Sequence, residues 1–338
     1  MAAIEKFAER ARKVARTIVL PEGQDPRVVV AAEKALAEKV VAKIIVLGTD
    51  AEIDAACKEG GVAKTNFERL DYMKSPLFEE FAQQLYEMRK AKGLEIEKAR
   101  KMISSRIYFG AMMCRRGLAD GLVAGSIAST ADMLRAAFHC IGTAPGIKSA
   151  SSTFVMDLAH PTPSGDEVLL FADCGVNPNP DANQLVDIAM ATSNTYRSLF
   201  GKTPKVAFLS FSTKGSAEHD ILVKVKEAAA MFAQKVADAK LDILCDGELQ
   251  ADAALVPSVA KAKAPGSPLA GGANILIFPD LNAGNIAYKL VQRLGQAKAY
   301  GPVLQGVAKP LNDLSRGCSA EDIVGTICVT LLQAQAKQ

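Results

Sequence analysis

The fold class is decided by the stretch Thr17-Ile18-Val19-Leu20-Pro21-Glu22-Gly23-Gln24-Asp25-Pro26. Its first four residues are mostly β-branched and predict a short strand. The pair Asp25-Pro26 is typical of a helix start, with the aspartate as N-cap and the proline at the first helical position. A second strand is predicted at 42–47, where Gly48 ends it. Short β-branched runs that alternate with amphipathic stretches predict α/β layers around a mainly parallel sheet.

The same alternation continues through the rest of the chain. A long helix is predicted from Ser75-Pro76 to Lys92, and Gly93 fits a left-handed cap at its end. Further strands are predicted at 121–124, 152–156, 168–172, 205–210, 241–245 and 273–278, and further helices at the N-terminus, through Arg135 and at 181–199, 217–237, 283–295 and 320–336. At 338 residues the chain exceeds the usual size of one hydrophobic core, so we expect two α/β domains with helix-flanked sheets. The segment 142–146 breaks both periodicities and is the best candidate for the crossover between them.

The composition is that of a folded soluble protein. Apolar residues make up 49% and charged residues 23%, and no apolar run approaches the roughly 18 to 20 residues of a membrane span. Acidic and basic residues interrupt residues 1–16, which argues against a signal peptide and favours a cytoplasmic location. A net charge of +3 without a dense basic block predicts no nucleic-acid partner. Seven cysteines without a C-x-x-C pair and three histidines without ligand spacing predict neither disulfides nor a metal site.

The densest group of candidate functional residues lies at 312–322, with the sequence NDLSRGCSAED. Arg316 offers a planar fork for phosphate or a polarised carbonyl oxygen, and Ser315 adds a hydroxyl beside it. Asp322 is the plausible general base at this position. A second interpretation competes with this one, because Ser319-x-x-Asp322 matches a capping box in which the aspartate only bonds the start of a helix.

Three further positions are candidates, each with a plain structural alternative. Arg89 lies near the end of a predicted helix, where the helix dipole favours a basic residue without any ligand. Arg135 lies three residues after Asp132 and can simply pair with it. The polar loop 210–216 follows a predicted strand, at the edge where α/β sheets bind ligands, but it is equally suited to be a connector with helix-capping serines.

Ten short sequence motifs along the chain, taken together and in this order, are specific enough to indicate a protein family. They are TIVLPEG at 17–23, YFGAMM at 108–113, FADC at 171–174, VNPNP at 176–180, LSFST at 209–213, DGELQ at 246–250, FPDL at 278–281, GNI at 284–286, YKLVQR at 288–293 and the loop 312–318. Through these strings the chain resembles the phosphate acetyltransferase family over essentially its whole length. Its size matches the short, single-function form of that enzyme.

The resemblance implies a subunit of two α/β domains, with residues 1–146 plus 300–338 as a discontinuous first domain and 147–299 as the second. It also implies an active site in the cleft between the domains and assembly into homodimers. The implied reaction is reversible transfer of an acetyl group between acetyl phosphate and coenzyme A, with phosphate as the other small-molecule partner. No metal or bound cofactor is implied, since coenzyme A is itself a substrate.

By the same resemblance, five positions have roles: Asp322 as the base that deprotonates the thiol, Ser315 and Arg316 beside the acyl phosphate, and Arg89 and Arg135 on the phosphate. A contact of Ser212, Thr213 and Lys214 with the nucleotide end of coenzyme A is a further hypothesis. Two other functions stay open: the chain is a phosphate butyryltransferase, or it is a module that senses acetyl-CoA without catalysing a reaction. A metal-dependent dehydrogenase of related architecture is disfavoured, because the chain contains no G-x-G-x-x-G fingerprint.

Overall fold

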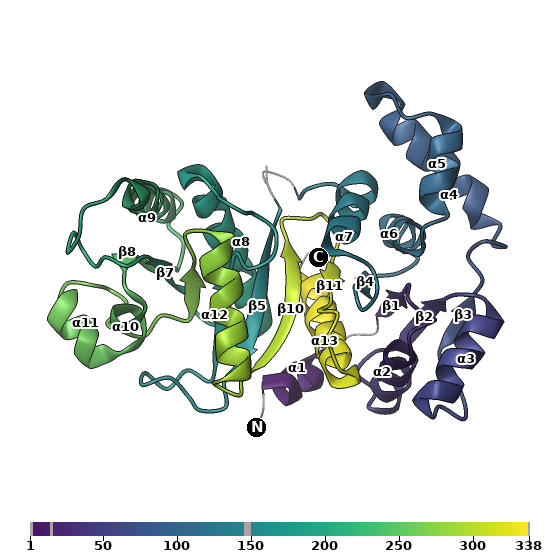
Figure 1. The fold of residues 1–338 in the computed structure, drawn as a ribbon, viewed down its shortest axis with the longest axis horizontal. Helices are drawn as coiled ribbons and strands as arrows, with labels where there is room; N and C mark the ends of the chain where they lie inside the picture. The colour runs from purple at the N-terminus through teal and green to yellow at the C-terminus, as the bar shows by residue number, and fades with distance from the viewer. Residues whose placement is uncertain (1–2, 14–15, 145–149, 337–338) are drawn as a thin grey trace. The chain divides into compact units, whose positions relative to one another are not determined.

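The computed structural model describes residues 3–13, 16–144 and 150–336 (Figure 1). The chain divides into two compact units, Ala3–Pro145 with Val307–Gln338, and Gly146–Gly306. The expected return to the first unit at residue 300 lies inside strand β10, Lys298–Gln305, which pairs with a strand of the second unit. The predicted crossover at 142–146 falls partly outside the described residues.

The first unit contains a five-stranded parallel sheet with helices on both faces. The strand order is β11-β4-β1-β2-β3. Figure 1 shows α2 and α3 on one side of this sheet and α4 to α6 on the other. The elements are α1 Ala3–Ala11, β1 Thr17–Leu20, α2 Pro26–Ala37, β2 Lys43–Leu47, α3 Asp50–Gly60, β3 Glu68–Leu70, α4 Leu77–Arg89, the 3₁₀ turn η1 Lys90–Lys92, α5 Ile96–Ile103, α6 Arg106–Arg115, β4 Gly121–Ala124, α7 Thr130–Ala136, the π-helical turn η2 Ala137–Ile141, β11 Leu311–Asp313 and α13 Ala320–Ala336.

Helix ends in this unit follow the predicted chemistry. Asp25 caps α2 by accepting a hydrogen bond from the backbone nitrogen of Arg27 at 2.9 Å, and Pro26 occupies the first turn. The helix predicted up to Lys92 is α4 followed by the turn η1. Gly93 closes it with φ of 81°, a left-handed conformation that favours glycine.

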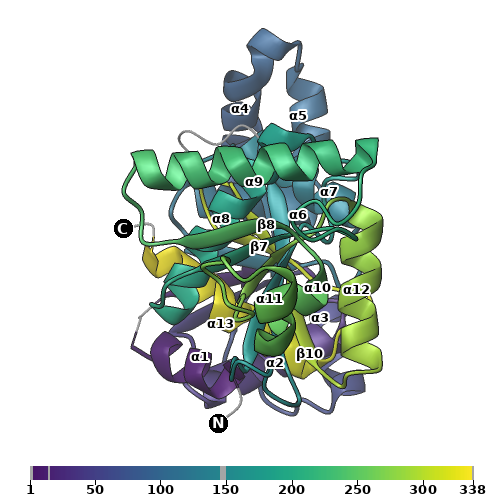
Figure 2. The same cartoon turned by 90° about the vertical axis from the view of Figure 1, so that its left-hand side faces the viewer.

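The second unit contains a six-stranded sheet in the order β10-β5-β6-β9-β7-β8. The last four strands are parallel, whereas β5 runs antiparallel to both β10 and β6. Figure 2 shows α8 and α9 on one face of the sheet and α10 to α12 on the other. The elements are β5 Ser151–Asp157, β6 Val168–Ala172, α8 Ala182–Phe200, β7 Lys205–Leu209, α9 Asp220–Asp238, β8 Leu244–Leu249, α10 Ala251–Leu255, α11 Pro257–Lys263, β9 Ile275–Ile277, α12 Leu281–Arg293 and β10. Two mainly parallel, helix-flanked sheets confirm the predicted fold class.

The predicted elements differ from the structure mainly where strand propensity is low. The strand predicted at 241–245 is wrong in its bounds, because β8 begins at Leu244 and continues to Leu249. Its residues 246–248, Asp-Gly-Glu, have low strand propensity, and pairing with β7 keeps them extended. Short β3 and β11 and the proline-containing β10 carry no clear strand pattern. Among the described residues, no helix combines the length and apolar character needed to cross a membrane.

Candidate active site

Two loops leave neighbouring strands at the carboxyl edge of the first sheet. Strand β11 pairs in parallel with β4, and Asp313 lies opposite Ala124 at the end of both strands. The next residues of each strand therefore begin loops on the same edge, 125–129 after β4 and 314–319 after β11. This edge is where parallel α/β sheets place their ligand-binding groups.

The side chain of Glu22 organises the loop 125–129. It follows β1 and is buried, and its carboxylate accepts hydrogen bonds from the backbone nitrogens of Gly125, Ser126, Ile127 and Ala128 at 2.8, 2.9, 3.0 and 2.6 Å. The Ser126 hydroxyl adds a fifth hydrogen bond at 2.9 Å. Four successive N–H groups aimed at one carboxylate form an anion-binding nest, so Glu22 fixes the path of this loop.

Arg27 ties the two loops together. Its guanidinium donates to the carbonyl oxygens of Arg316 at 2.7 Å, Cys318 at 3.1 Å and Ser126 at 3.1 Å. Asp25 holds the same guanidinium through an ion pair of 2.6 Å. Arg316 returns the connection, because its Nε donates to the carbonyl oxygen of Ile127 at 3.1 Å. Arg27 therefore holds the backbone carbonyls of Arg316 and Cys318 in place. The exposed side chain of Arg316 donates to a neutral carbonyl oxygen.

Asp313 is a buried carboxyl group beneath these loops. Its Oδ2 accepts a hydrogen bond from the Thr130 hydroxyl at 2.6 Å, and its Oδ1 has no partner among the described residues. Burial raises the pKa of Asp313 to about 7, the charge of Glu22 adds to this effect, and Thr130 and Arg316 oppose it. Gly125 has φ of 113°, and a Cβ there would lie 2.0 Å from Oδ1, so only glycine fits over this carboxyl.

Asp322 caps the helix that carries it. Its Oδ2 accepts from the backbone nitrogen of Ser319 at 2.9 Å, and its own nitrogen donates to the Ser319 hydroxyl at 3.1 Å. The capping-box interpretation is therefore confirmed, while a role as base stays a prediction. Ser315 is exposed, and within the described part of the chain its hydroxyl accepts one long hydrogen bond, 3.4 Å, from the nitrogen of Gly317.

Arg89 and Arg135 come from different helices, α4 and α7. The charges of both influence the same two side chains, Tyr108 and His139. The Tyr108 hydroxyl and Nδ1 of His139 form a hydrogen bond of 2.7 Å. Burial, and then the charges of Arg89 and Arg135, lower the pKa of His139. Burial raises the pKa of Tyr108 to about 12 against the pull of the same two arginines. Arg135 pairs with Asp132 at 2.5 Å, as its plain alternative predicts, whereas Arg89 makes no ion pair among the described residues.

In the second unit, the polar loop 210–216 is bonded largely to itself and to β8. Ser212 is fully buried and donates to Glu248 at 3.0 Å, and the Thr213 hydroxyl accepts from the nitrogen of Gln250 at 2.9 Å. Lys214 pairs with Asp246. These contacts fit the interpretation of the loop as a connector, and a contact of the three residues with coenzyme A stays a prediction.

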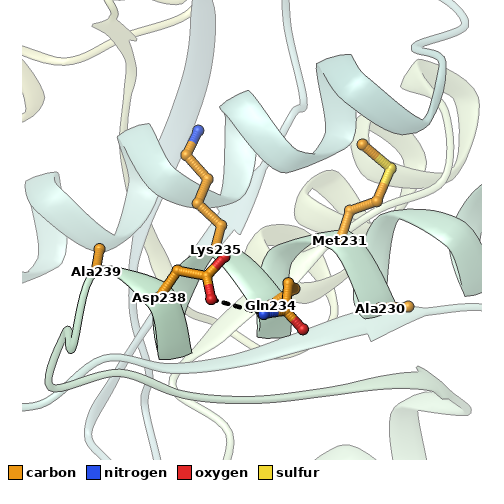
Figure 3. Close-up of a pocket in the computed structure, with 6 residues that line it drawn as sticks. All are labelled: Ala230, Met231, Gln234, Lys235, Asp238 and Ala239. Carbon is orange, nitrogen blue, oxygen red and sulfur yellow. Dashed lines mark hydrogen bonds between the residues drawn. The ribbon is translucent and has the colours of Figure 1, made fainter.

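Two hollows among the described residues of the second unit are large enough to consider as binding sites. One, of about 610 Å³, opens next to the same loop, between the residues that follow β7 and those that follow β9. The other, of about 770 Å³, is a shallow surface along α9, lined by Ala230, Met231, Gln234, Lys235, Asp238 and Ala239 (Figure 3). In the second hollow Gln234 bonds Asp238 along the helix at 2.7 Å, and no polar groups converge on a common point. Only the first has the character of a binding site.

Comparison with known proteins places this arrangement in a family. Residues 2–331 match the family model described as phosphate acetyl/butaryl transferase. The chain belongs to this family. It is 50% identical to a phosphate acetyltransferase of Thermoanaerobacterium thermosaccharolyticum over 99% of this chain and 100% of the relative. A second phosphate acetyltransferase, from Acetivibrio thermocellus, is 48% identical over 99% of both chains.

Solved structures agree with the family assignment. The chain superimposes on the EutD phosphotransacetylase from Staphylococcus aureus with a TM-score of 0.86 and 41% identity, covering 98% of this chain and 99% of the other. A phosphotransacetylase from Streptococcus pyogenes gives a TM-score of 0.87 with 41% identity and 98% coverage of both chains.

Sequence reasoning about this transferase-family site missed its supporting residues. Glu22, Arg27 and Asp313 carry no local signal of function, and each acts on a segment about a hundred or more residues away. A charged residue directly after a predicted strand is the one available hint. Glu22 lies close to such a position, two residues after the end of β1, whereas Asp313 is the last residue of β11, a strand that the sequence pattern does not predict.

Proposed function

We propose that the chain is a phosphate acetyltransferase, which moves an acetyl group between acetyl phosphate and the thiol of coenzyme A. Relatives with this name are 42 to 50% identical over nearly the full length of the chain, which supports the assignment. The observation that carries the proposal is how the backbone and the guanidinium of Arg316 are bonded. Its backbone carbonyl is held by Arg27, and among the described residues its guanidinium donates only to a neutral carbonyl, so its positive charge stays available to an anionic substrate.

The proposed reaction is direct transfer between two bound substrates. Asp322 takes the thiol proton, and the sulfur attacks the acetyl carbonyl carbon to form a carbon–sulfur bond. The carbon–oxygen bond to phosphate then breaks, and phosphate leaves with the electron pair. Arg316, with Ser315, stabilises the negative charge that develops on the carbonyl oxygen. Arg89 and Arg135 hold the phosphate and favour its departure.

The carboxylate of Asp322 lies at the N-terminus of α13, where its Oδ2 also accepts the capping hydrogen bond from the nitrogen of Ser319. A free thiol has a pKa near 8.5, so little thiolate exists at neutral pH and a positioned carboxylate contributes on the order of 10² to 10⁴-fold.

The remaining expectations form part of the same proposal. We infer a cytoplasmic homodimer that needs no bound cofactor, because coenzyme A is consumed as a substrate. Support for assembly comes from the exposed apolar side chains Ile286, Leu290 and Leu294, which follow helical spacing along α12 and its end. Light scattering on the purified protein measures the mass and tests the dimer. An active site in a cleft between the two units stays a prediction.

The deciding experiment is thioester formation from coenzyme A and acetyl phosphate by the purified protein, followed by ultraviolet absorbance. The wild-type protein should form acetyl-CoA, and the Arg316→Ala variant should lose most of the turnover. Butyryl phosphate in the same assay separates acetyl from butyryl specificity. A folded wild-type protein that forms no thioester from either acyl phosphate would refute the proposed function.

A further inference from the structure

The helix that follows β4 ends in a π-helical turn with neighbours from three other parts of the first unit. Helix α7 continues without a break into this turn, η2, and such turns occur frequently at functional sites. The turn contacts α4, α6 and α7, and Figure 1 shows α6 between α7 and the paired helices α4 and α5. His139 in η2 follows Arg135 by four residues, so the two side chains begin from neighbouring positions on one helical surface.

A hydrogen bond fixes the imidazole ring of His139. The Tyr108 hydroxyl lies 2.7 Å from its Nδ1, and the centroids of the two rings are 5.9 Å apart. Burial raises the pKa of Tyr108 to about 12, so the phenol keeps its proton and donates it to Nδ1. The opposite tautomer would leave this largely buried proton without an acceptor among the described residues. The neutral imidazole therefore carries its own proton on Nε2, which is available to a ligand or to water.

Positive charge surrounds this ring. Burial lowers the pKa of His139, and three cations lower it further, those of Arg89 at the end of α4, Arg135 in α7 and Lys92 in η1. Within the described residues no carboxylate is among the groups that act on its pKa. Asp132 of α7 is the nearby acid, and it is paired with Arg135 at the exposed surface.

The other groups packed around the turn do not supply a compensating negative charge. Arg115 of α6 donates to the backbone carbonyl of Cys140 at 2.9 Å, so this cation is bonded to the backbone of η2. Burial raises the pKa of the Cys140 thiol to about 12, which keeps the thiol neutral. A neutral histidine among cations, with no acid to balance them, is suited to an anionic ligand.

A phosphate dianion reverses the electrostatic balance at the ring. Its two negative charges offset the repulsion between the cations and a charged imidazole, so they favour protonation by solvent. The bond to Tyr108 survives this change, because a phenol hydroxyl can also accept from Nδ1–H. We propose that His139, held by Tyr108, belongs to the phosphate site of Arg89 and Arg135 and takes up a proton when the phosphate dianion binds. The inference rests on the proposed function and adds a proton-carrying group to that site.

The sign of the pH dependence follows from this proton. Between the pKa of His139 in the free protein, which is below 6.5, and its higher value in the complex, binding of the dianion takes up a proton. Affinity for the dianion therefore falls as pH rises through this range, by up to about tenfold per pH unit. Asp313 also titrates near neutral pH, so a wild-type pH profile alone does not isolate His139 and a comparison of variants is required.

The kinetic experiment compares His139→Gln with the wild-type protein at pH 6 and pH 8.5. Glutamine can still bond the Tyr108 hydroxyl but cannot become charged, so we expect KM for acetyl phosphate to be about tenfold above wild type at pH 6 and close to it at pH 8.5. Tyr108→Phe, which removes the bond that holds the ring, should raise the same KM at pH 6. His160→Gln is the control, because this histidine is exposed in the second unit, and it should match wild type at both pH values. An equal KM ratio at both pH values in His139→Gln would indicate a structural role alone and overturn the inference.

Nuclear magnetic resonance measures the same proton without turnover. The chain has three histidines, His139, His160 and His219, so their imidazole C2 protons can be followed separately, and His139→Gln assigns the signal of His139. Saturating inorganic phosphate should raise the pKa of His139 by at least about one pH unit and leave the other two unchanged. An unchanged pKa of His139 in protein that binds phosphate by calorimetry, or no binding of phosphate, would overturn the inference. If the protein forms no acetyl-CoA, the proposed function fails, and this titration still decides whether His139 gains a proton with phosphate.

Discussion

The buried carboxyl of Asp313 predicts an unusual gain of stability on substitution. Asp313→Asn keeps the shape of the side chain and can still accept the Thr130 hydroxyl through its amide oxygen. The variant removes the ability to ionise in a buried position, where burial is the main cause of the raised pKa. We therefore expect it to be more stable than the wild-type protein, by an amount that depends on pH.

The magnitude follows from the two pKa values of this group. In the unfolded chain it titrates near 3.8, and in the folded protein burial raises its pKa to about 7. Between these values the folded protein holds a proton that the unfolded chain has released, so stability falls as pH rises from about 4 to about 7 and then levels off. Since one pKa unit corresponds to about 1.4 kcal/mol, the wild-type protein loses on the order of 4 kcal/mol over this range, and asparagine loses none.

Thermal unfolding at pH 4.5, 6 and 8 measures this difference. The chain contains no tryptophan, so circular dichroism is the suitable signal. The melting temperature of Asp313→Asn should nearly equal that of wild type at pH 4.5 and exceed it by several degrees at pH 8. An equal difference at all three pH values, or a less stable variant at pH 8, would contradict the buried-proton argument.

Asp173→Asn provides the matched control in the second unit. Asp173 is buried as well, but both of its oxygens accept hydrogen bonds from N–H donors, including the nitrogens of Gly175 at 3.0 Å and Asn177 at 2.9 Å. An amide group there would direct its own hydrogens toward these donors. We expect this variant to be destabilised by about 1 to 3 kcal/mol, in contrast to the stabilised Asp313→Asn.

Three further predictions concern the first unit. Glu22→Gln directs an amide toward the N–H groups of the loop 125–129, so we expect kcat in the acetyl-CoA assay to fall at least tenfold while the secondary structure measured by circular dichroism persists. Asp322→Asn should lower kcat by on the order of 10² to 10⁴, and near-normal turnover in a folded variant would leave Asp322 with the capping role alone. Gly125→Ala places a Cβ 2.0 Å from the Asp313 carboxyl at a positive φ, so we expect a lower melting temperature or loss of soluble protein, and an unchanged melting temperature would show that the loop has another conformation.

Much of the fold could be predicted because its signals are local. Strand β1 has the predicted bounds, and the cap of α2 by Asp25 and the end of the α4 segment at Gly93 follow from adjacent residues. Strand β8 departs from the prediction because its Asp-Gly-Glu residues become a strand only through pairing with β7. Local propensity fails where tertiary pairing decides the structure.

The residues of the candidate site also differ in whether a local sequence signal marks them. The loop 312–322 could be singled out, since Ser315, Arg316 and Asp322 are concentrated in one polar segment. The role of Glu22 could not, because its partners follow a different strand and are a hundred residues further along the chain. The cavity beside Phe211 was equally hidden, since its walls combine five separate segments that meet only in the folded sheet.

The arginines illustrate what the folded structure adds to a sequence. Arg27 and Arg135 each pair with a nearby aspartate, whereas Arg316 and Arg89 make no ion pair among the described residues. A neutralised arginine attracts an anion weakly, while one held by carbonyls or left unpaired keeps its full charge. Arg27 therefore builds the site by binding three backbone carbonyls, and Arg316 and Arg89 keep the charge that holds phosphate or stabilises the transition state. Arg135 shares its guanidinium with the exposed Asp132, so its proposed contact with the phosphate requires this surface ion pair to open. Substitution of Arg27 should thus alter the position of Arg316 and affect kcat, whereas substitution of Arg89 should act mainly on the binding of the anionic substrate.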